Sequence, residues 1–115
     1  MNLRATARDV GEVTVIDFGG GITLGEGSAL LRQMLRDLIA KGHRKIVLNL
    51  GDVNYIDSSG IGELVGGFIS MRNQKGELKL LNLTKKVQDL IQITKLYTVF
   101  DVYSDEAAAV RSFRP

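Results

Sequence analysis

The sequence predicts an α/β fold, in which a mixed, mostly parallel sheet of about five strands carries four helices. Two observations predict it. Apolar, β-branched stretches alternate with segments whose apolar residues recur at helical spacing, and glycines or capping residues separate them. Strands separated by helices pair in parallel through right-handed crossovers. The expected order is β-β-α-β-α-β-α-β-α in a single domain over residues 1–115, with one layer of helices on one side of the sheet.

The first half of the chain is expected to form a hairpin, a helix and a central strand. Residues 3–10 alternate weakly and residues 13–18 (VTVIDF) are apolar, so both are predicted strands joined by a turn. The three glycines 19–21 are predicted to open a loop. Residues 26–41 place their apolar side chains on one helical face. Residues 45–50 (KIVLNL) are apolar almost throughout, which is typical of a central strand covered on both faces.

The second half continues the alternation. Residues 60–74 are predicted to form a helix with an apolar stripe, and residues 77–83 (ELKLLNL) the next strand. Residues 84–94 follow as a third helix. Residues 99–103 form a short last strand, and residues 105–112 a final helix whose first residue, an aspartate, is a favoured cap.

Bulk composition narrows the class of protein. Of the 115 residues, 44% are hydrophobic and 24% charged, which is typical of a globular chain. There is no cysteine, which excludes disulfides and thiol chemistry. The net charge is +2, the basic residues are scattered and aromatics are few, so direct nucleic-acid binding is not expected. No apolar run reaches the ~20 residues of a membrane span and no secretory signal is seen, so a cytoplasmic protein is expected.

The segment YIDSSGIGEL, residues 55–64, lies where a strand-like region changes to a helix. Aspartate and serine are favoured N-caps because their side chains accept hydrogen bonds from free helix N–H groups. One cap would suffice, yet Asp57, Ser58 and Ser59 are all candidates. Gly60 and Gly62 leave the neighbouring backbone and hydroxyls open to a partner. Two interpretations stay open here: helix capping alone, or a site where a serine is modified.

The following helix contains glycines at 62, 66 and 67, each costing up to ~1 kcal/mol relative to alanine. Small or polar residues fall near one another at i+3 and i+4 spacing: Ser59, Gly62, Glu63, Gly66 and Ser70. Either they permit close packing against a neighbouring element, or they form a flat docking surface that runs from the serines. Spacing favours neither alternative.

Enzymatic chemistry is not expected. A serine hydrolase needs a base, and the single histidine, His43, precedes the central strand, at its opposite end from the serines. The segment also lacks a Gly-x-Ser-x-Gly elbow. The glycine-rich residues 19–28 lack the Lys-Ser/Thr ending of a phosphate-binding loop. The acidic residues show no metal-ligand spacing, so neither a metal nor a cofactor is expected.

The segment VLNLGDVNYIDSSGIGEL, residues 47–64, resembles the signature of STAS domains of the anti-sigma factor antagonist type. That signature is a central strand, an apolar and aromatic approach, then Asp-Ser-Ser-Gly and a helix. The element order matches over essentially the whole chain. The resemblance therefore implies a STAS fold for residues 1–115.

The resemblance also implies a partner-switching role in bacteria. In that family the unphosphorylated protein binds an anti-sigma factor that is also a serine kinase, and this releases a sigma factor. The kinase phosphorylates a serine of the motif, the antagonist dissociates, and a PP2C-type phosphatase resets it. By motif position the acceptor is Ser58, although spacing alone does not separate it from Ser59. Asp57 would cap the helix or orient the hydroxyl, while Ser59, Gly60 and Gly62 would shape the site.

The resemblance places partner contacts in the loop after the second strand and on the helix that follows the motif: Gly21, Thr23, Glu63, Gly66 and Ser70. Many antagonists carry an acid in that loop, whereas this chain has Thr23, which puts partner affinity or kinase handling in question. Two alternatives remain. The chain could be a STAS scaffold subunit of a larger stress-sensing or lipid-transport assembly, or a sensor of a small ligand or nucleotide.

Overall fold

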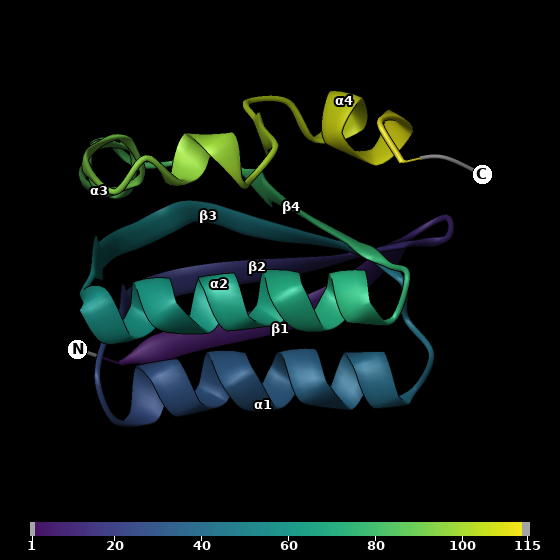
Figure 1. Ribbon diagram of the computed structural model, residues 1–115, viewed down its shortest axis with the longest axis horizontal. Helices are drawn as coiled ribbons and strands as arrows, with labels where there is room; N and C mark the ends of the chain where they lie inside the picture. Colours follow the sequence, from purple (N-terminus) through teal and green to yellow (C-terminus); the bar gives the residue numbers. More distant parts are fainter. Residues whose placement is uncertain (1, 114–115) are drawn as a thin grey trace.

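The computed structural model describes residues 2–113, and a five-stranded sheet lies at its centre (Figure 1). The strand order is β1-β2-β3-β4-β5; the first pair is antiparallel and every other pair is parallel. The strand bounds are β1 Leu3–Val10, β2 Val13–Ile22, β3 Lys45–Ile56, β4 Glu77–Leu81 and β5 Val102–Tyr103. The predicted fold class and element order are thereby confirmed.

The helices between the strands are α1 Glu26–Ala40, α2 Ser58–Asn73, α3 Lys85–Ile93 and the 3-10 helix η1 Leu96–Thr98, and α4 Glu106–Arg111 follows β5. In Figure 1, α1 and α2 run side by side in the lower half of the view, with α2 in front of β1 and β2, whereas α3 and α4 lie at the top. Among the helices of residues 2–113, none has the length and apolar character that a bilayer crossing requires.

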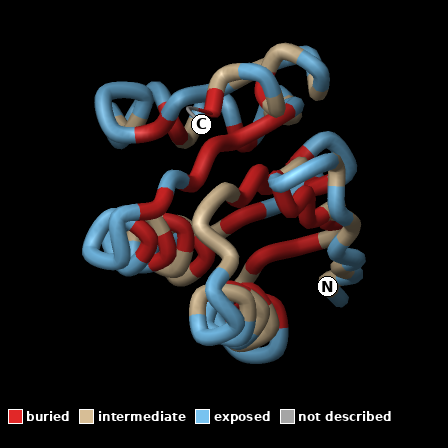
Figure 2. The backbone as a smooth tube through the Cα atoms, turned by 90° about the vertical axis from the view of Figure 1, so that its right-hand side faces the viewer, coloured by how far each residue is buried: buried red, intermediate tan, exposed pale blue. Residues whose placement is uncertain are grey.

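The expectation of a single helical layer is wrong, because the sheet buries apolar side chains on both faces. Most of the core lies between the sheet and the pair α1 and α2, with Ile16, Leu48 and Leu64 fully buried. A second cluster on the opposite face joins β2, β3 and β4 to Ala109 and Phe113, in and just after α4. Figure 2 shows buried backbone along the strands and exposed outer sides on the helices. A short helix is therefore needed on the second face as well.

The three glycines 19–21 belong to β2, whereas they were expected to open a loop. They pair with β1 on one side and β3 on the other, with register shifts between Asp17 and Gly19 and between Gly20 and Gly21. Gly20 has φ 100°, and a side chain there would collide with the Asn2 carbonyl. The neighbouring strands β1 and β3 provide hydrogen-bond partners for the backbone of these three residues. Glycine suits the irregular positions because it has no side chain to restrict the backbone there.

β3 is longer than predicted, and β5 is shorter than the strand expected over residues 99–103. β3 continues to Ile56 because its second half pairs with the glycine-containing end of β2, from Gly19 with Asp52 to Ile22 with Ile56. This extension brings the Asp-Ser-Ser segment beside the end of β2. After α3 the chain forms η1, and only residues 102–103 pair with β4.

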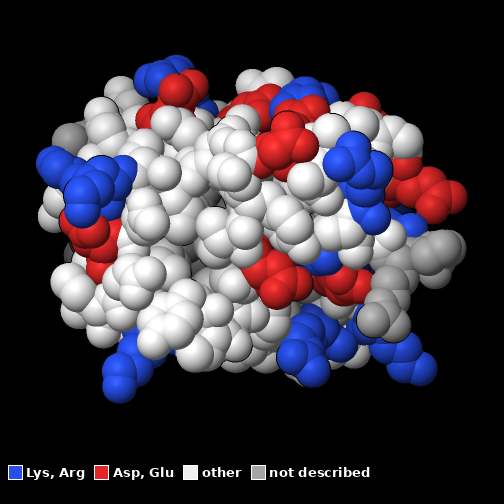
Figure 3. Space-filling view, turned by 90° about the horizontal axis from the view of Figure 1, so that it is seen from above, with Lys and Arg blue, Asp and Glu red and all other residues white. Residues whose placement is uncertain are grey.

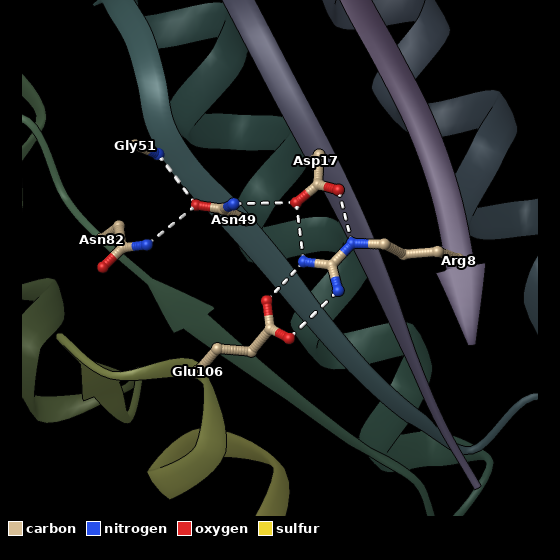
Figure 4. A network of polar contacts seen from close by, with 6 residues as sticks. All are labelled: Arg8, Asp17, Asn49, Gly51, Asn82 and Glu106. Atoms are coloured by element: carbon tan, nitrogen blue, oxygen red, sulfur yellow. Dashed lines mark hydrogen bonds and ion pairs between the residues drawn. The ribbon is translucent and has the colours of Figure 1, made fainter. Parts of the chain in front are cut away.

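Helix α4 is attached to the sheet by a polar network centred on Arg8 (Figure 4). The Arg8 guanidinium donates to both oxygens of Asp17 on β2, at 2.6 and 3.2 Å, and to the carboxylate of Glu106. Asn49 on β3 extends the network by donating to Asp17 at 2.8 Å. Figure 3, which shows the face carrying α3 and α4, has acidic and basic side chains interspersed.

Candidate functional site

The site lies where the carboxyl ends of β2 and β3 meet the amino terminus of α2. These strands are parallel neighbours, and Ile22 pairs with Ile56 at their ends. The Asp57 N–H then donates to the Ile22 carbonyl at 3.3 Å. The loop after β2 and the Asp-Ser-Ser segment after β3 are therefore brought together, although 34 positions separate Ile22 from Ile56 in the numbering of the chain.

Asp57 caps α2 and also binds the loop after β2. Its backbone is extended, with φ −107° and ψ −175°, as expected of a cap residue. The Gly60 N–H donates to its Oδ1 at 2.9 Å, and the Leu24 N–H donates to its Oδ2 at 2.9 Å. These bonds, the Gly60 bond first, lower the pKa of the Asp57 carboxyl. Asp57 is therefore ionised at neutral pH, and both of its oxygens are engaged by backbone, which favours the predicted capping role over orientation of a hydroxyl.

The two adjacent serines lie in different environments. Ser58 is the first residue of α2 and is exposed. Ser59 is half-buried, and its hydroxyl donates to the Ser28 hydroxyl of α1 at 3.0 Å. Ser28 itself is only 3% exposed. Ser58 thus presents its hydroxyl at the surface, whereas Ser59 joins the first turns of two helices.

The helix glycines divide into two kinds. A side chain at Gly60 would collide with the Ile22 carbonyl, and one at Gly67 would collide with the Leu35 side chain. At Gly62 and Gly66, by contrast, an added methyl group would meet nothing within 4 Å among the described residues, and both are exposed. The packing interpretation therefore holds for Gly60 and Gly67. It leaves Gly62 and Gly66 unexplained.

The remaining predicted contact residues are dispersed. Gly21 is buried within β2, where the Gly27 backbone approaches it closely, so it is not on the surface as expected. Thr23 is half-buried, and its carbonyl accepts the Ser28 N–H at 2.9 Å. Glu63 is ion-paired with Arg32 of α1 at 2.8 Å.

Ser70 is exposed three turns along α2 from Ser58. Like Gly62 and Gly66, it lies on the outer side of the helix. The sequence reasoning missed Leu24, a residue of the same loop as Thr23, whose side chain is 81% exposed. An apolar residue between turn residues was the available signal, but only the folded loop shows that its side chain points outward.

At this site the exposed hydroxyl of Ser58, at the amino terminus of α2, can carry a covalently attached group. Free N–H groups and the positive end of the helix dipole favour an anion there. The single histidine is engaged elsewhere, since His43 Nδ1 lies 2.7 Å from the hydroxyl of Thr14 near the start of β3. The geometry suits modification by another enzyme better than catalysis by the chain itself.

Comparison with known protein families gives a match to one family, the STAS domain. The match covers residues 4–109. The anti-sigma-B factor antagonist of Bacillus subtilis (strain 168) is 35% identical over 82 residues, covering 71% of this chain and 74% of that protein. The anti-sigma F factor antagonist of Paenibacillus polymyxa is 23% identical over 110 residues, covering 96% of this chain and 94% of that protein. The similarity thus extends over nearly the full element order.

Solved structures agree with that similarity. The Thermotoga maritima protein TM1081 superposes with a TM-score of 0.89 at 25% identity, covering 96% of this chain and 95% of that one. An anti-sigma factor antagonist from Mycobacterium paratuberculosis gives a TM-score of 0.85 at 18% identity, covering 99% and 96%. SpoIIAA of Bacillus in its phosphorylated form gives 0.76 at 22% identity, covering 96% and 100%. At such identities the last two matches show the fold.

Proposed function

Because this chain belongs to the STAS domain family, with relatives named anti-sigma factor antagonists, we propose that it binds an anti-sigma factor and thereby frees a sigma factor. Those antagonists are regulatory binding proteins, so the proposed role is a binding switch. Ser58 is the proposed phosphoacceptor. The proposed kinase is the anti-sigma factor itself, and a PP2C-type phosphatase reverses the reaction. This role requires a cytoplasmic location, where sigma factors act.

The observation that carries the proposal is the different exposure of the two motif serines. A kinase must reach the hydroxyl that it modifies, and Ser58 is exposed at the start of α2. The hydroxyl of Ser59 is engaged by Ser28, so phosphorylation there would separate α1 from α2. The structural environment therefore supports Ser58, the serine that the family motif also indicates.

A phosphate at Ser58 would act on the partner more than on the fold. It adds about −1.5 to −2 charge at pH 7. The free N–H groups and dipole of α2 favour an anion at that position, so the domain should tolerate it. A docked partner would have to desolvate the dianion or meet it with its own acids. A penalty of ~3 kcal/mol would weaken binding about a hundredfold.

Helix α2 supplies the proposed docking face. Ser58, Gly62 and Gly66 follow one another at i+4 spacing and are exposed, so they form one stripe on the outer side of the helix. Because nothing within 4 Å in residues 2–113 fills the space above the two glycines, a partner backbone can approach the helix there. Glu63 and Ser70 border this stripe.

The first experiment maps phosphate in the protein purified from its native cells, by mass spectrometry of peptides covering residues 45–72. Phosphate on Ser58 that varies with stress or growth phase, together with an anti-sigma factor that co-purifies, is the expected result. A constant partner without phosphate under any condition would instead indicate a scaffold subunit.

The matched variants are Ser58→Asp and Ser58→Ala, titrated against that anti-sigma factor by calorimetry. The aspartate places a charge at the proposed acceptor, so binding should weaken about tenfold or more. The alanine should bind like the wild type and resist phosphorylation. Circular dichroism should show the same fold in both. Equal binding by the two variants would count strongly against a charge-operated switch.

A further inference from the structure

The loop between β2 and α1 holds an exposed apolar side chain on a fixed backbone. Leu24 is 81% exposed, the largest exposed fraction among the exposed large hydrophobic residues. Three hydrogen bonds, two between backbone groups and one to a carboxylate, fix the loop around it. The Thr23 carbonyl accepts the Ser28 N–H at 2.9 Å, the Gly25 carbonyl accepts the Ala29 N–H at 3.0 Å, and the Leu24 N–H donates to Asp57 at 2.9 Å.

The third bond connects this loop to the proposed phosphosite. One Asp57 oxygen accepts the Leu24 N–H, and the other accepts the Gly60 N–H in the first turn of α2. A single carboxylate therefore joins the loop to the helix turn that carries Ser58. Aspartate is not needed for capping alone, since asparagine and serine cap equally well. The second bond, to the loop, is the one that calls for a further explanation.

A single exposed leucine is ordinary on a protein surface and implies nothing by itself. Leu24 differs because its backbone is fixed and because it lies beside a proposed interface. A backbone that is held in place before binding loses little conformational freedom when a partner buries the side chain that it carries. Gly25, the next residue, has φ 99°, and apart from its chain neighbours nothing in residues 2–113 lies within 4 Å of the position where a Cβ would be.

We propose that Leu24 is a preformed apolar anchor that inserts into an apolar pocket of the anti-sigma factor, and that Asp57 is the positioning residue that presents it. The inference rests on the proposed function and names one side chain that binds the partner and one that acts through it. It adds an uncharged contact to the interface, next to the charge-sensitive contact at Ser58.

The positioning role is tested on the isolated chain with Asp57→Asn. A carboxamide has one acceptor oxygen, so it can serve the Gly60 N–H as a cap but then turns an N–H group toward the Leu24 N–H. Amide hydrogen exchange measures the result at a single site. The Leu24 amide should exchange at least about tenfold faster in Asp57→Asn than in the wild type, and at the wild-type rate in Ser58→Ala. Equal exchange in all three proteins would overturn the positioning role.

The anchor is tested by calorimetry with the purified anti-sigma factor that co-purifies with the wild-type chain. Leu24→Ala should weaken binding about 30-fold, the size of an interface hot spot, without a change in circular dichroism. The matched control is Ile93→Ala, which truncates another aliphatic residue, 77% exposed at the end of α3. Its affinity should stay within about threefold of the wild type. Wild-type affinity in Leu24→Ala would overturn the anchor and leave the proposed function standing.

A double-mutant cycle separates positioning from any other effect of Asp57. If Asp57 acts through Leu24, the double variant that carries both Asp57→Asn and Leu24→Ala should bind the anti-sigma factor no more weakly than Leu24→Ala alone. Losses that simply add would mean that Asp57 acts through the helix cap, which overturns its positioning role. Failure of the wild-type chain to bind any anti-sigma factor would instead refute the proposed function itself.

Discussion

At the scale of single residues, the two serines of the Asp-Ser-Ser segment differ in their surroundings. Ser59 completes a contact between α1 and α2 through the buried Ser28 hydroxyl, and Ser58 projects from the same turn into solvent. One helical step of about 100° separates two consecutive side chains. That rotation is enough to direct one hydroxyl inward and the other outward.

Replacing the two serines by alanine should therefore have opposite consequences. Ser59→Ala leaves the buried Ser28 hydroxyl without its partner, so the free energy of unfolding should fall by about 1–2 kcal/mol. Ser58→Ala removes an exposed hydroxyl and should change stability by less than about 0.5 kcal/mol. Urea titration of both variants measures the difference. A larger loss in Ser58→Ala than in Ser59→Ala would contradict the assignment of the two environments.

At the scale of elements, α2 carries two pairs of glycines with different purposes. Gly60 and Gly67 allow the helix to approach β2 and α1 closely, and larger residues would force the elements apart. Gly62 and Gly66 contribute no such packing, yet they lower the helical propensity of α2. A sequence that keeps a destabilising residue at an open position is consistent with a binding requirement there.

Alanine substitutions should distinguish the two pairs. Gly62→Ala and Gly66→Ala should raise the free energy of unfolding by up to ~1 kcal/mol each, because alanine favours a helix and the added methyl group has room. Both should weaken binding to the anti-sigma factor if α2 is the docking face. Gly60→Ala should destabilise the fold by about 1–3 kcal/mol through overpacking against the Ile22 carbonyl, and Gly67→Ala should cost less, because it meets the end of the Leu35 side chain.

Chemical denaturation and calorimetry together provide the readout for these four variants. Asn73→Ala, at the exposed end of α2, is the matched control for a change in helix propensity alone. More stable Gly62 and Gly66 variants that bind the partner normally would exclude the glycine stripe from the interface.

At the scale of the whole molecule, the Arg8 network joins parts of the chain that lie far apart in sequence. Arg8 on β1 and Glu106 on α4 are 98 positions apart, and Asp17 on β2 shares the same guanidinium. Within residues 2–113, Ala109, Val110 and Phe113 anchor this end of the chain in the second apolar cluster, and the polar contacts of Arg8 add to the attachment of α4. Lys79 adds to it, since its ammonium donates to the Ser112 hydroxyl at 2.8 Å.

This arrangement should make the attachment of α4 sensitive to acid. The Arg8 hydrogen bonds lower the pKa of both Asp17 and Glu106. Folding therefore releases protons near pH 4, where these carboxyls ordinarily titrate. Their stabilisation is complete above that range and is lost as the pH falls through the lowered values of the folded state. The side chains are more than a third exposed, so solvent and salt should make the effect modest.

Unfolding followed between pH 7 and pH 3, together with amide exchange in α4, tests this prediction. Glu106→Gln should speed exchange in α4 at pH 7 and flatten the pH dependence. The control Asp89→Asn removes a carboxylate from an exposed pair with Lys85 on α3 and should change the profile little. A pH profile of Glu106→Gln that matches the wild type would show that the network does not hold the helix.

The features that the sequence predicted correctly are those set by interactions between residues close together in the chain. Helical spacing, β-branched runs and capping residues act over a few positions, and they predicted the element order and a helix cap among residues 57–59, of which the structure shows Asp57 to be the cap. The glycines 19–21 were misassigned because their strand exists only through pairing with β1 and β3. The last strand was predicted too long, since only residues 102–103 pair with β4, and Phe100 is buried in the core before that pairing begins.

The sequence by itself determined the alternation of strands and helices and the strand-to-helix junction at Asp57, because periodicity and capping are local properties. Only the tertiary structure decided which serine faces solvent, which glycines pack and how Leu24 is presented. Those outcomes depend on Ser28, Ile22 and Asp57, which are brought into contact by strand pairing across the fold. Exposure is a property of such long-range contacts, and no local pattern contains it.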